Sequence, residues 1–518
     1  MPEQTLLLEL PEQPEPAMAP TPQQTPKLVS INRAQDSWEL VVVDYLIGQD
    51  HKARLIWELT GNLDLSGFAT GIRSSEGSAG RPTWDPRLMV SVWLYAYCRG
   101  ISSAREIARE MEHEPGLRWL TGLQLINHHS LSDFRVQQGE ALSGLFAQSL
   151  VAMEQAGWVN LERVMHDGTK IRAQAGSDSF RREKTVREKL EQARKLVEQD
   201  PQAEDGTANR RREAAQQRAR REREQSLQQA LEELEKIQNG KDSVAEEAQA
   251  RVSVSEPEAR FMKHGDAAIA PSYNAQLSTD AVEGVIVGVK LTQAAEDSHQ
   301  LVPAMEEVHK NLGRAPDQAV ADGGYTNRES IEKMEERQID FIGSLPDPKD
   351  RSAAAMKAAG IDPNYAPHFF IFQPESKTLQ CPAGKSLAYV GPNRKRGNLY
   401  LQYRADGQDC QSCQFQKQCC PRTPWKGRTV SRLETENAVV ARFRVKMGSD
   451  AAREIYRQRG AIAEFPFAWI KQKFGLRKFC LFGIAKAEIE MKWACLAHNL
   501  MIWIRKCRPQ PQTPIPVF

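Results

Sequence analysis

Two aspartates have the residue type and surroundings needed for metal chemistry on a phosphodiester. Asp167 and Asp322 each end a short run with the apolar alternation of a β-strand, and glycine follows each of them. If the two strands are neighbours, both carboxylates project from one sheet edge, where glycine lets a bulky ligand approach. Such oxygen ligands suit Mg²⁺ or Mn²⁺. Two ions roughly 3.5–4 Å apart activate a water or a 3′-hydroxyl and stabilise the leaving oxygen. Asp-Gly is also ordinary turn chemistry, so neither aspartate is decisive alone.

A third carboxylate lies on a helix expected near the end of the chain. Glu464 and Lys471 are seven residues apart and share a helix face, and Arg457 lies seven residues before Glu464. A carboxylate flanked by Arg and Lys suits a metal beside a DNA phosphate. Ion pairs within a solvated helix are the plain alternative. Pro466 can start or kink the helix near Glu464.

Five of the nine cysteines fall within residues 381–420, which suits a reduced cytosol and a metal site better than disulfides. The residues selected as tetrahedral zinc ligands are Cys381, Cys410, Cys413 and Cys419, with Cys420 as an alternative. Such a site would be structural, because protein ligands fill all four positions. The alternative is a set of reduced thiols without a metal.

His166, beside Asp167, is a candidate for proton transfer, although a histidine at a strand end is more often structural. Basic side chains cluster at residues 393–396 and 471–478, where they would contact phosphates or lie in solvated loops.

Length and composition set the frame for these candidates. A chain of 518 residues exceeds one hydrophobic core, so roughly two to four domains are expected. The net charge of +2 does not indicate nucleic-acid binding, so any DNA-binding surface must come from local clusters. No apolar run reaches about 18 residues, and the first residues do not resemble a secretory signal. We therefore expect no membrane span and a cytoplasmic location.

Changes in residue composition and apolar pattern along the chain mark its expected domains. Residues 1–37 are rich in Pro, Gln and Thr and are expected to form a disordered tail. Residues 38–157 have helical patterns, with a capped start at Ser103 and a long helix from His129 through Met153. Short helices joined by tight turns are compatible with a helix-turn-helix DNA-binding domain, and equally with a plain helical bundle.

Strand patterns begin near residue 158. The expected elements are strands or helices at 159–171, 273–279, 285–291, 299–311, 318–322, 328–337 and 340–344. Their order, strand, hairpin, helix, strand, helix, strand, favours a mixed sheet covered by helices. We assign this α/β domain to 158–346 plus 430–506, interrupted by a charged helical arm at 178–250. The cysteine-rich insertion is 347–429, and 507–518 is a tail. The arm could equally be a solvated insertion without a partner.

Longer stretches resemble one family. They are GRPTWDPRLMVSVWLYAYCRGISSAREIARE, HDGTKIRA, SEPEARFMKHGD followed by APSYNAQ, ADGGYTN, and CPAGK with its later cysteines. Through them the chain resembles the DDE transposases of the insertion sequence 1182 family, found in bacterial insertion sequences. The resemblance implies an α+β multidomain protein with an RNase H-like catalytic domain. It also implies that Asp167, Asp322 and Glu464 are the three catalytic, metal-binding acids.

The resemblance further implies that Tyr456, Arg459 and Lys471 occupy the other positions of a tyrosine–arginine–glutamate–lysine signature and contact or orient DNA. Four residues separate Arg459 from Glu464, where the signature usually has three, and this leaves open whether Arg457 takes the arginine's role. The six-residue gap from Glu464 to Lys471 matches the signature.

The sequence as a whole predicts a transposase that uses two Mg²⁺ or Mn²⁺ ions to cut the ends of its element and join them to target DNA. The expected partners are double-stranded DNA, as terminal inverted repeats and target, and a second copy of the chain. The expected location is the bacterial nucleoid. The alternatives are a metal-dependent nuclease without joining activity, and an inactive transposase-derived DNA-binding protein.

Overall fold

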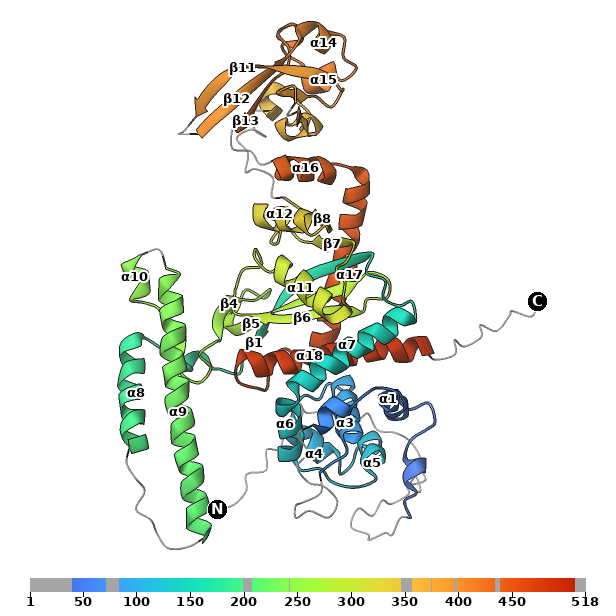
Figure 1. Cartoon of the computed structure of the whole chain (residues 1–518), viewed down its shortest axis with the longest axis vertical. Coiled ribbons are helices and arrows are strands. Elements are labelled where there is room, and N and C mark those ends of the chain that lie inside the picture. Colours follow the sequence, from blue (N-terminus) through green and yellow to red (C-terminus); the bar gives the residue numbers. More distant parts are fainter. Residues whose placement is uncertain are drawn as a thin grey trace, which may run out of the picture. The chain divides into compact units, whose positions relative to one another are not determined.

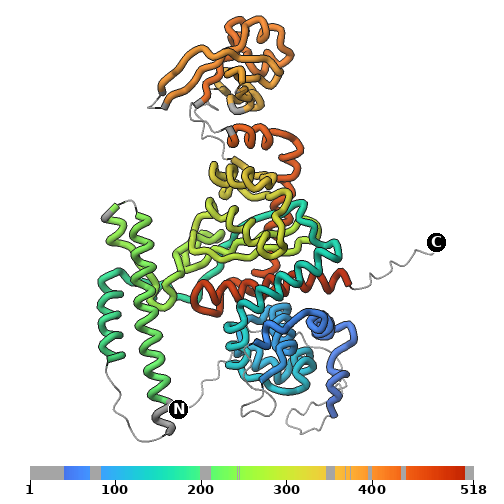
Figure 2. The backbone as a smooth tube through the Cα atoms, in the orientation of Figure 1, coloured from blue at the N-terminus to red at the C-terminus, as the bar shows by residue number. Residues whose placement is uncertain are grey.

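The computed structural model describes residues 40–70, 83–198, 207–241, 243–345, 356–373, 375–395, 398–433 and 438–507. The predicted tail at 1–37 lies outside these residues, as does 508–518 of the predicted tail at 507–518. Residues 1–42 form one unit and residues 43–518 another, and the elements below belong to the second. Figure 2 follows the backbone from end to end.

The N-terminal part of this unit is helical. Its elements are η1 (Val43–Leu46), α1 (Lys52–Gly61), α2 (Ser66–Ala69), α3 (Pro86–Cys98), α4 (Ala104–Glu110), α5 (Pro115–Thr121), α6 (His128–Gln137) and α7 (Gly139–Gln155). Helix α3 is buried from Met89 to Tyr97 because almost every side chain there is apolar. The Ser103 hydroxyl accepts a hydrogen bond from the Glu106 backbone N–H at 3.4 Å, so the predicted cap of α4 is present.

The single long helix predicted over 129–153 is wrong, because α6 and α7 are separate helices. The break falls at Gln138, whose backbone angles of φ −104° and ψ 30° leave helical geometry. Next to it, a Cβ on Gly139 would lie 2.7 Å from the Ile489 side chain of α18 (Ile484–Cys507). The close approach of α18 is a tertiary contact that the local pattern of residues could not reveal.

A mixed sheet comes next along the chain. Its strands are β1 (Arg163–Arg172), β4 (Arg260–Lys263), β5 (Ile269–Asp280), β6 (Ile286–Thr292), β7 (Gln318–Ala321) and β8 (Asp340–Gly343). They lie in the order β4-β5-β1-β7-β8, and β6 also pairs with β5. The pairs β1–β7 and β7–β8 are parallel, and the other pairs are antiparallel. The predicted hairpin is confirmed as β5–β6.

Helices pack on both faces of this sheet (Figure 1). Met165 of β1 belongs to a cluster with Ala452 and Ala463 of α17 (Asp450–Gln472), so α17 covers the face of β1 that carries the odd-numbered side chains. His166 points to the other face, where its ring lies 4.8 Å from that of Tyr325. Helix α11 (Leu301–Leu312) contacts β5, β6 and α12 (Arg328–Glu336), and α16 (Ala438–Met447) contacts α12 and α17.

Helix α18 connects the sheet to the N-terminal helices. The Asn499 side chain makes two hydrogen bonds with the Ile286 backbone of β6, at 2.9 and 2.8 Å. On the side of α3, the rings of Trp493 and Trp93 lie 6.5 Å apart. The N-terminal helices and the sheet therefore share one hydrophobic core.

Residues 178–250 contain a pair of long helices that pack side by side (Figure 1). The elements of this region are η2 (Ser177–Ser179), β2 (Phe180–Arg181), α8 (Glu183–Glu198), α9 (Thr207–Asn239), α10 (Val244–Glu247) and β3 (Val252–Ser253). The pair has its own small apolar cluster, which includes Val186, Leu190, Leu227 and Leu234. The sparse apolar stripe read from the sequence is therefore the seam between α8 and α9.

The cysteine-rich region forms a second sheet with its own apolar cluster. Its elements are η3 (Pro363–Tyr365), η4 (Pro367–Phe369), β9 (Ile371–Gln373), β10 (Thr378–Gln380), β11 (Ser386–Lys395), β12 (Asn398–Ala405), α14 (Gly407–Gln411), α15 (Gln416–Cys419), η5 (Pro424–Lys426) and β13 (Thr429–Leu433). The strands are antiparallel in the order β13-β12-β11-β10-β9. None of the helices among the described residues is long and apolar enough to cross a membrane.

Candidate active site

Asp167 and Asp322 lie on neighbouring parallel strands. Met165 of β1 pairs with Val320 of β7, so the same register two residues further on brings Asp167 level with Asp322. The expectation that Asp167 ends its strand is wrong: β1 continues to Arg172, because its pairing with β5 extends beyond its pairing with β7. Asp322 does follow the last residue of β7, as expected.

Asp167 is held in a largely buried position. Its side chain is 17% exposed, and one carboxylate oxygen accepts a hydrogen bond from the Gly168 backbone N–H at 2.8 Å. Burial raises the pKa of Asp167 to about 6, and the negative charges of Asp322 and Glu464 raise it further against the effects of Gly168 and Arg459. Asp322 and Glu464 are thus close enough to Asp167 to raise its pKa.

Asp322 has a looser environment. Its carboxylate accepts a hydrogen bond from the Gly324 backbone N–H at 2.8 Å, which closes a short turn after β7. The turn chemistry that the Asp-Gly pair suggested is therefore real at this position. It fixes one oxygen of Asp322, Oδ1, within the turn.

Glu464 comes from α17, which continues through Pro466 without a break. Of the two effects expected of Pro466, a helix start near Glu464 is wrong, because α17 begins at Asp450. The Glu464 side chain is 65% exposed, and its carboxylate lies 3.8 Å from the Arg459 guanidinium. Arg459 also lies 3.5 Å from the Asp167 carboxylate, so it bridges two of the three acids.

The structure separates the two arginines that the sequence could not. Arg457 is exposed and pairs with Glu454 at 2.7 Å on the outer side of α17. Arg459 is only 16% exposed and lies between the helix and the sheet. The seven-residue spacing did predict that Arg457 shares a face with Glu464, but that face is the solvent-facing one.

Two other signature residues also lie near the acids. Lys471 donates a hydrogen bond from Nζ to the Thr169 hydroxyl at 2.5 Å, and Thr169 is on the same face of β1 as Asp167. Burial lowers the pKa of Lys471. The Tyr456 ring centroid lies 6.0 Å from the guanidinium carbon of Arg459. The side chains of Lys471, Tyr456 and Arg459 thus belong to the helix–sheet junction that holds the acids.

The opposite face of β1 carries a buried polar network that the sequence did not identify as a unit. The Gln276 side-chain oxygen lies 2.9 Å from His166 Nε2 and 2.7 Å from the Tyr325 hydroxyl. Asp297 accepts hydrogen bonds from Gln276 at 2.9 Å and from Asn274 at 2.6 Å. Burial lowers the pKa of His166 to about 4, so the imidazole is neutral at pH 7.

His166 is therefore part of this network and points away from Asp167, so a role in proton transfer has no support. Asn274 and Asp297 fell in family-like stretches, and the pairing of β5 with β6, which sets Asn274 opposite Thr292, brings them together. Gly168 separates the network from the acids, because a Cβ there would lie 2.5 Å from the Gln276 amide nitrogen and 2.6 Å from the Tyr325 hydroxyl.

Two comparisons with family models bear on these residues. Residues 380–502 match a family described as a transposase DDE domain, and residues 41–137 match a transposase domain, DUF772. The two matches indicate a DDE transposase. The DDE-domain match of the transposase includes Glu464 and the clustered cysteines, and Asp167 and Asp322 lie between the matched stretches. No curated protein and no solved structure matches the chain.

The three acids of the candidate site suit a divalent ion by chemistry, but they are not arranged around one in the described residues. Three carboxylates supply the hard oxygen donors that Mg²⁺ and Mn²⁺ prefer. Within the part of the chain that the structure describes, no group of three or more His, Cys, Asp or Glu side chains is positioned to hold a metal. The guanidinium of Arg459 instead supplies the positive charge between Asp167 and Glu464.

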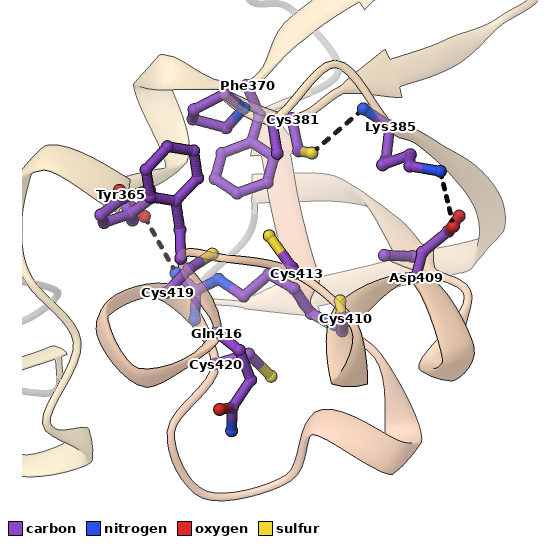
Figure 3. A pocket seen from close by; sticks show the side chains of 15 residues that line it. Tyr365, Phe370, Cys381, Lys385, Asp409, Cys410, Cys413, Gln416, Cys419 and Cys420 are labelled. Carbon is purple, nitrogen blue, oxygen red and sulfur yellow. Dashed lines mark hydrogen bonds and ion pairs between the residues drawn. The ribbon is translucent and has the colours of Figure 1, made fainter.

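The five clustered cysteines line one small cavity of about 30 Å³, which has room for a small ion or a water molecule (Figure 3). The thiols on its wall are Cys381, Cys410, Cys413, Cys419 and Cys420. Backbone N–H groups of Lys385 and Arg428 donate hydrogen bonds to the sulfurs of Cys381 and Cys410, at 3.3 and 3.4 Å. Burial raises the pKa of Cys419 to about 12, so this thiol keeps its proton at neutral pH unless a cation replaces it.

Proposed function

We propose that the chain cuts the ends of a bacterial insertion sequence and joins them to target DNA, with Asp167, Asp322 and Glu464 as its catalytic, metal-binding acids. The observation that carries this proposal is the convergence of the three: two on neighbouring parallel strands, and the third on the helix packed across them. The effect of Asp322 and Glu464 on the pKa of Asp167 supports it. The location in the bacterial nucleoid follows from this function.

In this proposal the acids bind two Mg²⁺ or Mn²⁺ ions, which would activate a water or a 3′-hydroxyl and stabilise the leaving oxygen of the phosphodiester. The residues of the chain position the reactants. Asp322 is oriented by the Gly324 N–H, and Asp167 is oriented by the Gly168 N–H. Lys471 and Arg459 neutralise or contact DNA phosphates, and Tyr456 and the exposed Arg457 complete the DNA-binding set around α17.

The sheet supports an RNase H-like catalytic domain. Its central order, β6-β5-β1-β7-β8, combines antiparallel neighbours on one side of β1 with parallel neighbours on the other, and acids follow or lie on the two central strands. Membership of the insertion sequence 1182 family is part of the same proposal. The helices α1 to α6, within the DUF772 match, are proposed to recognise terminal repeats, and two copies of the chain are proposed to pair the ends.

The thiol-lined cavity supports a structural zinc site held by Cys381, Cys410, Cys413 and Cys419. Figure 3 shows all five clustered cysteines around this cavity, so Cys420 remains the alternative fourth ligand. Backbone N–H groups donate to two of the sulfurs, as they can to zinc-bound thiolates, although burial raises the pKa of Cys410 in the absence of a cation.

The decisive experiment is a strand-transfer assay with the full chain, Mg²⁺, a supercoiled plasmid and a labelled duplex that carries the DNA flanking the gene. We expect nicking at the element end and a labelled product joined to the plasmid. Asp322→Asn should lower both by about a hundredfold or more while retaining duplex binding. The matched control is Asp317→Asn, an exposed aspartate just before β7, which should leave both activities unchanged.

Cleavage without any joined product would contradict the transposase proposal and favour a metal-dependent nuclease. Duplex binding with no cleavage by the unaltered chain in Mg²⁺ or Mn²⁺ would favour an inactive DNA-binding descendant. Undiminished activity of Asp322→Asn would remove Asp322 from the catalytic set.

A further inference from the structure

Arg459 is the cation of the acidic site in the chain as it stands. Its two terminal nitrogens approach different acids, Nη1 at 3.5 Å from Asp167 and Nη2 at 3.8 Å from Glu464. Arg459 and Asp167 are only 16% and 17% exposed, so their contact is poorly screened by solvent, whereas Glu464 is 65% exposed and its contact is screened more. The arginine thereby neutralises part of a carboxylate cluster whose members repel one another.

Arg459 is also held loosely for a buried arginine. Neither contact has the short, two-pronged geometry that makes an Arg–carboxylate pair strong. Nη1 is buried and has no hydrogen-bond partner among the described residues. A buried N–H group without an acceptor is costly, so the arrangement gives up part of the hydrogen bonding that a guanidinium can form. A pairing of this kind supplies charge and little geometric specificity.

The other cations described near the acids have partners other than Asp167 and Glu464. Lys471 donates to the neutral hydroxyl of Thr169, and Lys170 pairs with Asp297 at 3.3 Å on the opposite face of β1. Arg457, two residues before Arg459, is directed to Glu454. Charge balance between Asp167 and Glu464 therefore depends on the single side chain of Arg459.

We propose that Arg459 acts as an internal substitute for the metal, holding the acids together in the metal-free protein and being displaced when a divalent ion binds. The inference rests on the proposed function, because it takes the three acids to be the metal ligands. It follows that metal binding must compete with the arginine, so the apparent metal affinity is lower than the acids alone would give. The displaced guanidinium would then be free to contact a DNA phosphate, which makes metal loading and DNA engagement favour each other.

The test compares Arg459→Gln with Arg457→Gln in the full chain. The second variant removes the same charge from the same helix, two residues away, but its partner is the exposed Glu454. Mn²⁺ binding is measured by calorimetry, and thermal unfolding is followed with and without saturating Mn²⁺. No DNA and no activity measurement is needed.

We expect Arg459→Gln to bind Mn²⁺ about tenfold more tightly than the unaltered chain, which corresponds to about 1.4 kcal/mol. Its Tm should fall in the absence of Mn²⁺, because the acids then repel one another without a cation, and the difference should shrink in saturating Mn²⁺. Arg457→Gln should match the unaltered chain in both measurements. Unchanged or weaker Mn²⁺ binding by Arg459→Gln would overturn the inference.

Two further variants keep the result interpretable. If Arg459→Gln does not fold, Arg459→Lys takes its place, since one ammonium group cannot reach both acids; tighter Mn²⁺ binding is again expected and its absence overturns the inference. Asp322→Asn tests the underlying function separately. Loss of Mn²⁺ binding in Asp322→Asn with no effect of Arg459→Gln would leave the acids as metal ligands and remove only the role of Arg459. Unchanged Mn²⁺ binding in Asp322→Asn would overturn the metal site itself.

Discussion

Asp167 and Asp322 stand level with each other on two neighbouring parallel strands, although 155 residues separate them in the chain. The pairing of Met165 with Val320 fixes this relationship, since a slip of one residue would turn one aspartate to the other face of the sheet. The two strands differ in where they end: β1 continues beyond Asp167, and β7 ends before Asp322. Asp167 therefore lies within a strand of the sheet, whereas Asp322 lies in the turn that follows its strand.

The raised pKa of Asp167 predicts a pH dependence of stability in protein without Mg²⁺ or Mn²⁺. The carboxyl keeps its proton to about pH 6 in the folded protein, whereas an unfolded aspartate loses it near pH 4. The stabilisation from that proton is complete below about pH 4 and is lost as the pH rises to about 6, by at most roughly 3 kcal/mol. Asp167→Asn should remove this component, measured as free energy of unfolding from pH 4 to 7.

Asp340→Asn is the control when the measurement is extended below about pH 4, because there it should change the pH dependence with the opposite sign. Burial raises the pKa of the Asp340 carboxyl, but hydrogen bonds from Lys446 and Gln318 lower it by more. The pKa of Asp340 is therefore below its usual value. Its contribution is present at neutral pH and is lost as the pH falls through the folded-state pKa. An identical pH dependence in Asp167→Asn and the unaltered chain would contradict the environment assigned to Asp167.

Gly168→Ala should destabilise the fold by about 1–3 kcal/mol, because the added methyl group meets a rigid network. The new Cβ would lie 2.5 Å from the Gln276 amide, 2.6 Å from the Tyr325 hydroxyl and 3.0 Å from Asp297. The variant should also lower DNA cleavage, since the network lies directly behind Asp167. Chemical denaturation measures the first effect.

Gly144→Ala is the matched substitution for Gly168→Ala. Gly144 lies inside α7, and a Cβ there meets nothing within 4 Å. Alanine is the better helix former, so stability should rise by up to about 1 kcal/mol. Equal effects of the two alanines would show that the network does not crowd Gly168.

Lys471→Ala should reduce DNA cleavage by about tenfold to a hundredfold, because it removes a half-buried cation beside the acids. Lys473→Ala removes an exposed lysine from the end of the same helix and should change cleavage by less than about threefold. Gel-based cleavage with the flanking-DNA duplex compares the two. If both variants lose activity equally, the basic cluster contributes general DNA affinity and Lys471 has no special position.

Metal analysis of the purified protein should find about one zinc ion per chain, since four thiolates make one tetrahedral site. Cys413→Ser and Cys419→Ser should each lose that zinc and lower the Tm, because both side chains line the cavity. Cys507→Ser, at the exposed end of α18, should keep the zinc. Zinc-free protein with an unchanged Tm would mean that the thiols pack without a metal.

The sequence by itself predicted most of the elements and the residues that could do chemistry. Alternating apolar residues predicted the β5–β6 hairpin and the strands that carry Asp167 and Asp322, and the spacing of Glu464 and Lys471 predicted their helix. These features depend on local periodicity, which a single sequence displays directly. The crowding of cysteines likewise predicted one shared site, and the five thiols line one cavity.

Only the tertiary structure decided which side chains meet. Helical spacing placed Arg457 on the face of Glu464, yet Arg459 bridges the acids, because Arg459, unlike Arg457, lies between α17 and the sheet. Strand alternation already directs His166 away from Asp167, and the pairing of β1 with β5 decides that it meets Gln276 and, through it, Asp297. Periodicity defines a face within one element, whereas the packing of elements far apart in the chain determines what that face contacts.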